Sequence, residues 1–169
     1  IGTANNITFG ASDIHIAKVN LASGTTAWYN QYGVSGNDHG NNILPADSGR
    51  LYLVGTVQSW GTGIRQGLVS LLDSNGNQIW NKAYDIPAIV NFLNAIRDNN
   101  HILTIGWADN TSNGDEAIVT KLDLNGNGVW SKTYHLNGNT NGNHIQKAPY
   151  GGYIVSGYNI SGNTQKLFV

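Results

Sequence analysis

The stretch Lys121–Tyr134, KLDLNGNGVWSKTY, decides the fold of this chain because it is one copy of a repeat. An earlier copy, LDSNGNQIWNKAY, covers Leu72–Tyr84, and a more divergent copy precedes it. In each copy a tryptophan is followed four residues later by a tyrosine. The pairs are Trp28 and Tyr32, Trp80 and Tyr84, and Trp130 and Tyr134. A period of about fifty residues is typical of repeat architectures such as propellers.

Each copy predicts four short strands, because β-branched and aromatic residues alternate with Gly, Asn and Pro punctuation. In the third copy these are 116–123, 128–135, 144–147 and 152–158. The second copy gives 67–73, 78–84, 92–97 and 101–107, and the first gives 13–20, 26–32, 42–44 and 51–57. The segment Asp85–Arg97 is also compatible with a short helix, although its place in the repeat favours a loop and a third strand.

The repeat organises the whole chain as a single segment. We expect units at 13–57, 67–107 and 115–158, with residues 1–4 as the last strand of one partial unit and 166–169 as the first strand of another. The first strand of each unit is nearly apolar, which is typical of strands covered on both faces. This pattern predicts that it is the innermost strand of a propeller blade.

Composition narrows the classes of function. The chain has 169 residues, of which 11% are charged, a net charge of −1 and a pI near 6.5, so it has no basic footprint for nucleic acid. No apolar run approaches membrane-spanning length. The absence of Cys excludes disulfides and thiolate metal sites, and the absence of Met indicates a processed chain or a piece of a longer one.

The motifs KLD-x-NGN, W-x-K-x-Y and GGYIVSGY (Gly151–Tyr158) resemble the repeat of secreted bacterial and archaeal β-propellers. They are more distantly similar to the blades of quinoprotein-like propellers. The resemblance covers essentially the whole chain, although Asn20–Gly24 departs from the D-x-N-G-N turn. It implies an all-β propeller of four-stranded antiparallel blades, with about three full blades and a partial strand at each end. It also implies an extracellular or cell-surface location.

The D-x-N-G-N motif has two interpretations. Asp123, Asn125 and Asn127 resemble the start of a calcium loop, but the twelfth position, which needs a bidentate Glu, is Tyr134. The alternative is a hairpin turn, in which Asn-Gly supplies positive φ angles. We favour the turn, and we expect no metal, no cofactor and no catalytic residue.

Six residues are candidates for ligand binding. Trp60 and Trp107 follow the fourth strand and are not repeated, and aromatic residues anchor many binding surfaces. The polar candidates in the longer links are Asp38, His39, Asp109 and His135. Links between strands two and three and between successive units are longer and more variable than the others. We expect both classes on one face, where variable loops on a rigid scaffold carry function.

Three sequons, at Asn6, Asn110 and Asn159, fall in the same link of the repeat. They are candidate glycosylation sites if the protein is secreted by a host that glycosylates.

The sequence therefore predicts a non-catalytic binding or scaffold module that uses the variable loop face. The alternatives are a carbohydrate-binding lectin, a fragment of a quinoprotein-like propeller enzyme, and a subunit of an extracellular filament. The expected partners are a protein or glycan ligand, other copies of the chain, or the remainder of a longer parent. Partial units leave apolar edges that proteins normally cover, which predicts a partner-completed ring or a filament.

Overall fold

The computed structural model describes residues 12–33, 35–58, 64–85, 89–110, 114–161 and 164–168. Within these ranges the chain is all-β, with no α-helix and a single 3-10 turn at Asp47–Gly49. Strands β1 to β13 form four antiparallel sheets. The expected all-β class is therefore confirmed.

The strands follow the order of the chain. They are β1 (Ile14–Val19), β2 (Thr26–Tyr32), β3 (His39–Pro45), β4 (Leu51–Gln58), β5 (Arg65–Leu72), β6 (Gln78–Tyr84), β7 (Ile89–Asp98), β8 (His101–Asn110), β9 (Gly114–Asp123), β10 (Gly128–Tyr134), β11 (Asn139–Lys147), β12 (Tyr153–Ser161) and β13 (Thr164–Phe168). Every predicted strand from residue 13 onward is present. The third strand of each copy is longer than expected, because its register shifts at an irregularity and pairing then continues.

The ambiguous segment Asp85–Arg97 is resolved where the structure describes it, since β7 begins at Ile89 and the helical alternative is wrong. Residues 166–168 of the expected partial unit lie in β13, which pairs with β12. Residues 1–4 and residue 169 lie outside the described residues.

The sheets do not coincide with the sequence copies. The two four-stranded sheets have the orders β3-β4-β5-β6 and β7-β8-β9-β10, and the others are β1-β2 and β11-β12-β13. Each four-stranded sheet thus combines the last two strands of one copy with the first two of the next. The prediction that the first strand is the innermost of its sheet is wrong, because β5 and β9 each have a neighbour on both sides.

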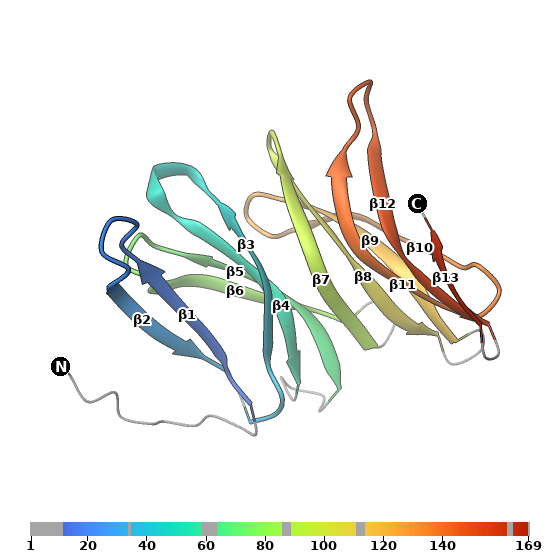
Figure 1. Cartoon of the computed structure of the whole chain (residues 1–169), viewed down its shortest axis with the longest axis horizontal. Coiled ribbons are helices and arrows are strands. Elements are labelled where there is room, and N and C mark those ends of the chain that lie inside the picture. Colours follow the sequence, from blue (N-terminus) through green and yellow to red (C-terminus); the bar gives the residue numbers. More distant parts are fainter. Residues whose placement is uncertain are drawn as a thin grey trace.

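The four sheets lie side by side in chain order (Figure 1). Apolar side chains fill the three spaces between them. One cluster, including Ile14 and Leu68, joins the first two sheets, a second around Phe92 and Val69 joins the next two, and a third around Ile105 and Ile145 joins the last two. β5 and β9 are buried along most of their length, as their apolar sequences predict, whereas β1 alternates between buried and exposed residues only at its start.

The strand registers give each sheet two distinct ends. The pairs His39 with Thr56, Gln58 with Arg65, and Gly67 with Tyr84 place the links after β2, β4 and β6 at the same end. We call this the loop end, and it also carries the links after β8, β10 and β12. The opposite end carries the tight turns at residues 20–25, 46–50, 73–77, 98–101, 123–127 and 148–152, and we call it the turn end. The links between second and third strands and between successive units therefore share one end, as expected. The links between units are not all longer, however, because the flanking strands leave only 111–113 after β8 and 162–163 after β12.

Candidate functional site

The D-x-N-G-N segments are closed hairpin turns at the turn end. In residues 73–77 the Asp73 Oδ1 atom accepts hydrogen bonds from the backbone N–H groups of Asn75 and Asn77, both at 2.8 Å, and Oδ2 accepts one from the Asn77 side chain at 2.9 Å. Asp123 makes the same three bonds with Asn125 and Asn127. Both carboxylate oxygens face amide donors, so the arrangement is that of the turn alternative.

These hydrogen bonds also set the charge state of the turn. Donation by the Asn77 side chain and backbone lowers the pKa of Asp73. Burial alone would raise the pKa of Asp123, but the hydrogen bonds from Asn127 and Asn125 outweigh it and lower this pKa as well. Each turn therefore holds an ionised aspartate at neutral pH.

Each D-x-N-G-N turn also lies against the Trp and Tyr of the preceding sheet. The Trp28 Nε1–H group donates to the Ser74 carbonyl oxygen at 3.1 Å, and the Asn30 side chain donates to the Asn75 carbonyl at 3.0 Å. The Tyr32 hydroxyl donates to the Gly76 carbonyl. Three side chains of β2 thus bind three consecutive carbonyls of the turn between β5 and β6.

The next pair of sheets repeats this arrangement. The Tyr84 hydroxyl donates to the Gly126 carbonyl at 2.7 Å, and Lys82 Nζ donates to Asn127 Oδ1 at 2.7 Å. A Cβ on Gly126 would lie 2.9 Å from the Trp80 ring, so only glycine fits there. Trp28 and Trp80 thus pack between successive sheets.

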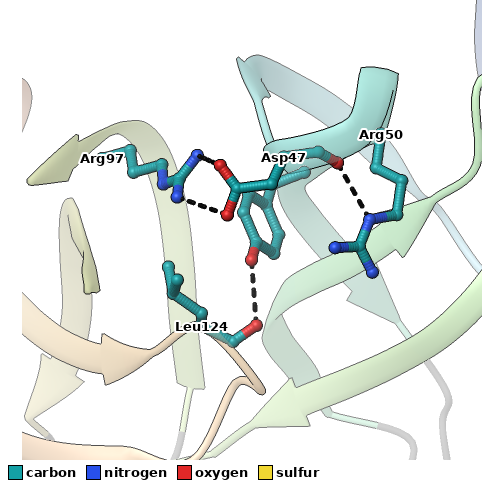
Figure 2. Close-up of polar contacts among 5 residues, drawn as sticks. Asp47, Arg50, Arg97 and Leu124 are labelled. Carbon is teal, nitrogen blue, oxygen red and sulfur yellow. Dashed lines mark hydrogen bonds and ion pairs between the residues drawn. The ribbon is translucent and has the colours of Figure 1, made fainter. Parts of the chain in front are cut away.

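A second set of turn-end contacts joins the two four-stranded sheets (Figure 2). The Arg97 guanidinium binds both carboxylate oxygens of Asp47, each at 2.8 Å, and Arg50 Nε donates to the Asp47 carbonyl at 3.0 Å. The Tyr52 hydroxyl donates to the Leu124 carbonyl at 2.9 Å. The hydrogen bonds from Arg97 lower the pKa of Asp47. The turn end is thus a scaffold of contacts between sheets.

The loop end carries a different cluster, at the boundary between the last two sheets. Trp107 and Asp109 alternate along β8, so they share the face that packs on β11. Asp109 lies opposite Asp115 of β9, and Trp107 lies opposite Asn91 of β7. We call Asn91, Trp107, Asp109, Asp115 and Asn141 the loop-end cluster; Asn141, on β11, is hydrogen-bonded to the Asp115 side chain.

The electrostatics of this cluster are unfavourable for folding. Burial and the neighbouring charge of Asp109 raise the pKa of Asp115, and the hydrogen bond from Asn141 offsets only part of this shift. Like charges directly opposite one another in an antiparallel pair are destabilising. The buried Asn91 Nδ2 atom has no hydrogen-bond partner among the described residues. A pairing that weakens the fold and leaves an amide unsatisfied is typical of a site for a ligand.

The preceding and following sheets lack this pair of aspartates at the corresponding positions. The cross-strand pair is Gln58 with Arg65 in the preceding sheet and Ile160 with Gln165 in the following one. The position of Trp107 is taken by Thr56 and Tyr158, since each follows the repeated glycine. The pairing of two aspartates beside a tryptophan therefore occurs at one of the three loop ends compared, whereas the turn-end contacts recur.

The remaining predicted ligand residues lie apart from this cluster. Asp38 is only 2% exposed, and its Oδ1 atom accepts the Gln58 backbone N–H at 3.0 Å, so this side chain is held within the fold. His39 is exposed at the start of β3, and His135 is exposed in the link after β10. Trp60 lies outside the described residues. Sequence reasoning found Trp107 and Asp109 but missed Asp115 and Asn141, which only strand pairing and sheet packing bring to them.

The structure describes the exposure of one of the three sequon asparagines. Asn159 is 8% exposed and its Nδ2 atom donates to Thr140 Oγ1 at 3.0 Å, so a glycan on that nitrogen requires this bond to break. Asn6 lies outside the described residues, and Asn110 is the last residue of β8.

The described residues contain no group of three or more His, Asp or Glu side chains placed to hold a metal ion. They also contain no helix long and apolar enough to cross a membrane. No protein-family model matches this chain. A search of curated proteins likewise finds no significant match.

Proposed function

We propose that the chain is an arc of a β-propeller that acts as a non-catalytic, extracellular binding module. Each four-stranded sheet is a blade, and β3, β7 and β11 are the innermost strands. These edge strands of consecutive sheets contact one another, and the Asn41 side chain on β3 donates to the Phe92 carbonyl on β7 at 2.8 Å. Sheets that converge along one edge and diverge at the other are the geometry of propeller blades.

The observation that carries the binding function is the uniqueness of the loop-end cluster on a repeated scaffold. Positions that recur hold the sheets together, whereas Trp107 and the opposed Asp109 and Asp115 occur together at one loop end among the described sheets, and the two carboxylates weaken the fold there. Residues selected only for stability would not place two carboxylates opposite each other. We therefore assign the ligand site to the loop end of β8 and β9.

The chemistry of the cluster favours a glycan as the ligand. A tryptophan offers an apolar face on which a sugar ring stacks, and the carboxylates and amides accept and donate hydrogen bonds to hydroxyl groups. Trp107 and Asp109 lie near the end of β8, and Asp115 lies near the start of β9, so both requirements are met at the same loop end. We therefore favour a glycan over a protein as the ligand, which makes the chain a lectin.

A glycan array with the purified chain tests this proposal. Trp107→Ala and Asp109→Asn are each expected to weaken binding at least tenfold, which corresponds to about 1.4 kcal/mol. Tyr150→Ala removes a fully exposed aromatic at the turn end and serves as the matched control, with unchanged binding. Equal binding by all variants would contradict the assigned site. Turnover with added quinone cofactor and calcium would instead favour the enzyme alternative.

A further inference from the structure

The third Trp–Tyr pair of the repeat differs from the first two in its surroundings. Trp130 is 37% exposed and Tyr134 is 47% exposed, and every residue of β10 is exposed. The equivalent residues of β2 and β6 are partly buried beneath a turn. Within the described part of the chain, neither the Trp130 side chain nor the Tyr134 side chain makes a hydrogen bond, although both residues pair with β9 through their backbones. The side chains that bind turns in two places are thus present and uncovered in a third.

The two occupied pairs define what fits the third. In both, the tyrosine hydroxyl donates to the carbonyl of a glycine with φ near +80°: Gly76 at +80° and Gly126 at +74°. The tryptophan ring lies against that glycine, since a Cβ there would be 2.8 Å from Trp28 and 2.9 Å from Trp80. Lys82, the middle residue of W-x-K-x-Y, binds the last Asn of the turn, and Lys132 holds this place in the third pair.

We propose that Trp130, Lys132 and Tyr134 form a docking surface for the Asp-x-Asn-Gly-Asn hairpin of a further copy of this repeat. A second observation supports the same occupant. β13 has β12 as its one neighbour among the described strands, whereas the equivalent strands β5 and β9 also pair with a W-x-K-x-Y strand. A hairpin that supplies the turn and this strand therefore completes both the surface and the sheet.

A second copy of the present chain is a poorer occupant. The turn of the first copy, at residues 20–25, is the equivalent turn that is not already docked within the chain. It is one residue longer than the Asp73–Asn77 turn: the Asn20 N–H donates to the Thr25 carbonyl, whereas the Asp73 N–H donates to the Asn77 carbonyl. Gly24, with φ of +67°, has nothing within 4 Å of a Cβ, so this turn lies on no tryptophan in the described part of the chain. Its β1 strand would also compete with β13 for the same place beside β12.

The test uses a labelled peptide with the sequence of residues 120–134, closed by a terminal disulfide and shown by NMR to be a hairpin. Fluorescence anisotropy is expected to show saturable binding to the intact chain. Trp130→Ala and Tyr134→Phe should weaken this binding at least tenfold and about fivefold, respectively. A peptide carrying Gly126→Asn, which tolerates positive φ but adds a side chain at the point of contact, should also bind at least tenfold more weakly.

Tyr150→Ala is the matched control and should bind the peptide like the unaltered chain. No binding by the folded hairpin, or binding indifferent to Trp130→Ala, would overturn the proposal. Sedimentation of the chain alone tests whether a second copy of the chain occupies the surface instead. A mass that rises with concentration, and that Gly24→Asn returns to the monomer, would show that the surface accepts a second copy and would also overturn it.

Discussion

The turn end and the loop end of the same sheets follow opposite rules. At the turn end the contacts recur from sheet to sheet: a Trp and a Tyr bind the glycine turn of the next sheet, first at Gly76 and then at Gly126. At the loop end the corresponding positions change from copy to copy, and one of them pairs Asp109 with Asp115. The difference teaches that repetition in this chain marks stability, whereas its interruption marks the candidate binding site.

The largest expected effect is that of a methyl group at the docked glycines. Gly126→Ala places a Cβ 2.9 Å from the Trp80 ring at a φ of +74°. Left-handed backbone costs about 1 kcal/mol or more and overpacking a further 1–3 kcal/mol, so we expect a loss of about 3 kcal/mol in the free energy of unfolding. Urea denaturation measures this loss.

Gly24→Ala is the matched control for that substitution, because φ is +67° but nothing lies within 4 Å of the new Cβ. It should cost only the backbone part, about 1 kcal/mol. Equal losses of stability for Gly126→Ala and Gly24→Ala would mean that the Gly126 turn does not pack against Trp80. The comparison between the two ends would then fail.

An intermediate effect is expected from Tyr84 at alkaline pH. Burial, followed by the charge of Asp123, raises the pKa of Tyr84 above its ordinary value of 10.0. The unfolded chain therefore loses its tyrosine proton first, so this contribution to stability is complete below about pH 10 and is lost as the pH rises toward the folded-state value.

Tyr84→Phe removes both this pH dependence and the hydrogen bond to Gly126. We expect it to be about 1 kcal/mol less stable at neutral pH, with the two stability curves converging as the pH rises above about 10 toward the folded-state value. Denaturant unfolding across this range measures both curves. Curves that stay parallel would show that Tyr84 is not protected by the turn.

The smallest effect belongs to the ion pair in Figure 2. The Asp47 side chain is 63% exposed, and solvent screens exposed pairs even when the geometry is bidentate. Arg97→Ala should lower the melting temperature by about 2 °C at most, and 1 M salt should remove the difference. A larger, salt-independent loss would show that this contact holds the two sheets together as strongly as the turns do.

Local features of the sequence predicted much of the fold. The alternation of residue types and the Asn-Gly turns predicted the strands. The grouping of strands into sheets was not predictable, because the period is the same wherever a unit is taken to begin. Trp107 was found because it breaks the repeat, and Asp109 was found because it is a polar residue near a link between units. Asp115 and Asn141 were missed, since only strand register and sheet packing bring them together.

The most direct test of the turn-end account is the free energy of unfolding of Trp80→Ala and Trp130→Ala, which remove the same residue of the repeat. Trp80 lies against the Gly126 turn and Trp130 is 37% exposed. The account predicts a loss of about 3 kcal/mol for Trp80→Ala and less than about 1 kcal/mol for Trp130→Ala. Equal losses, or a larger loss at Trp130, would contradict it.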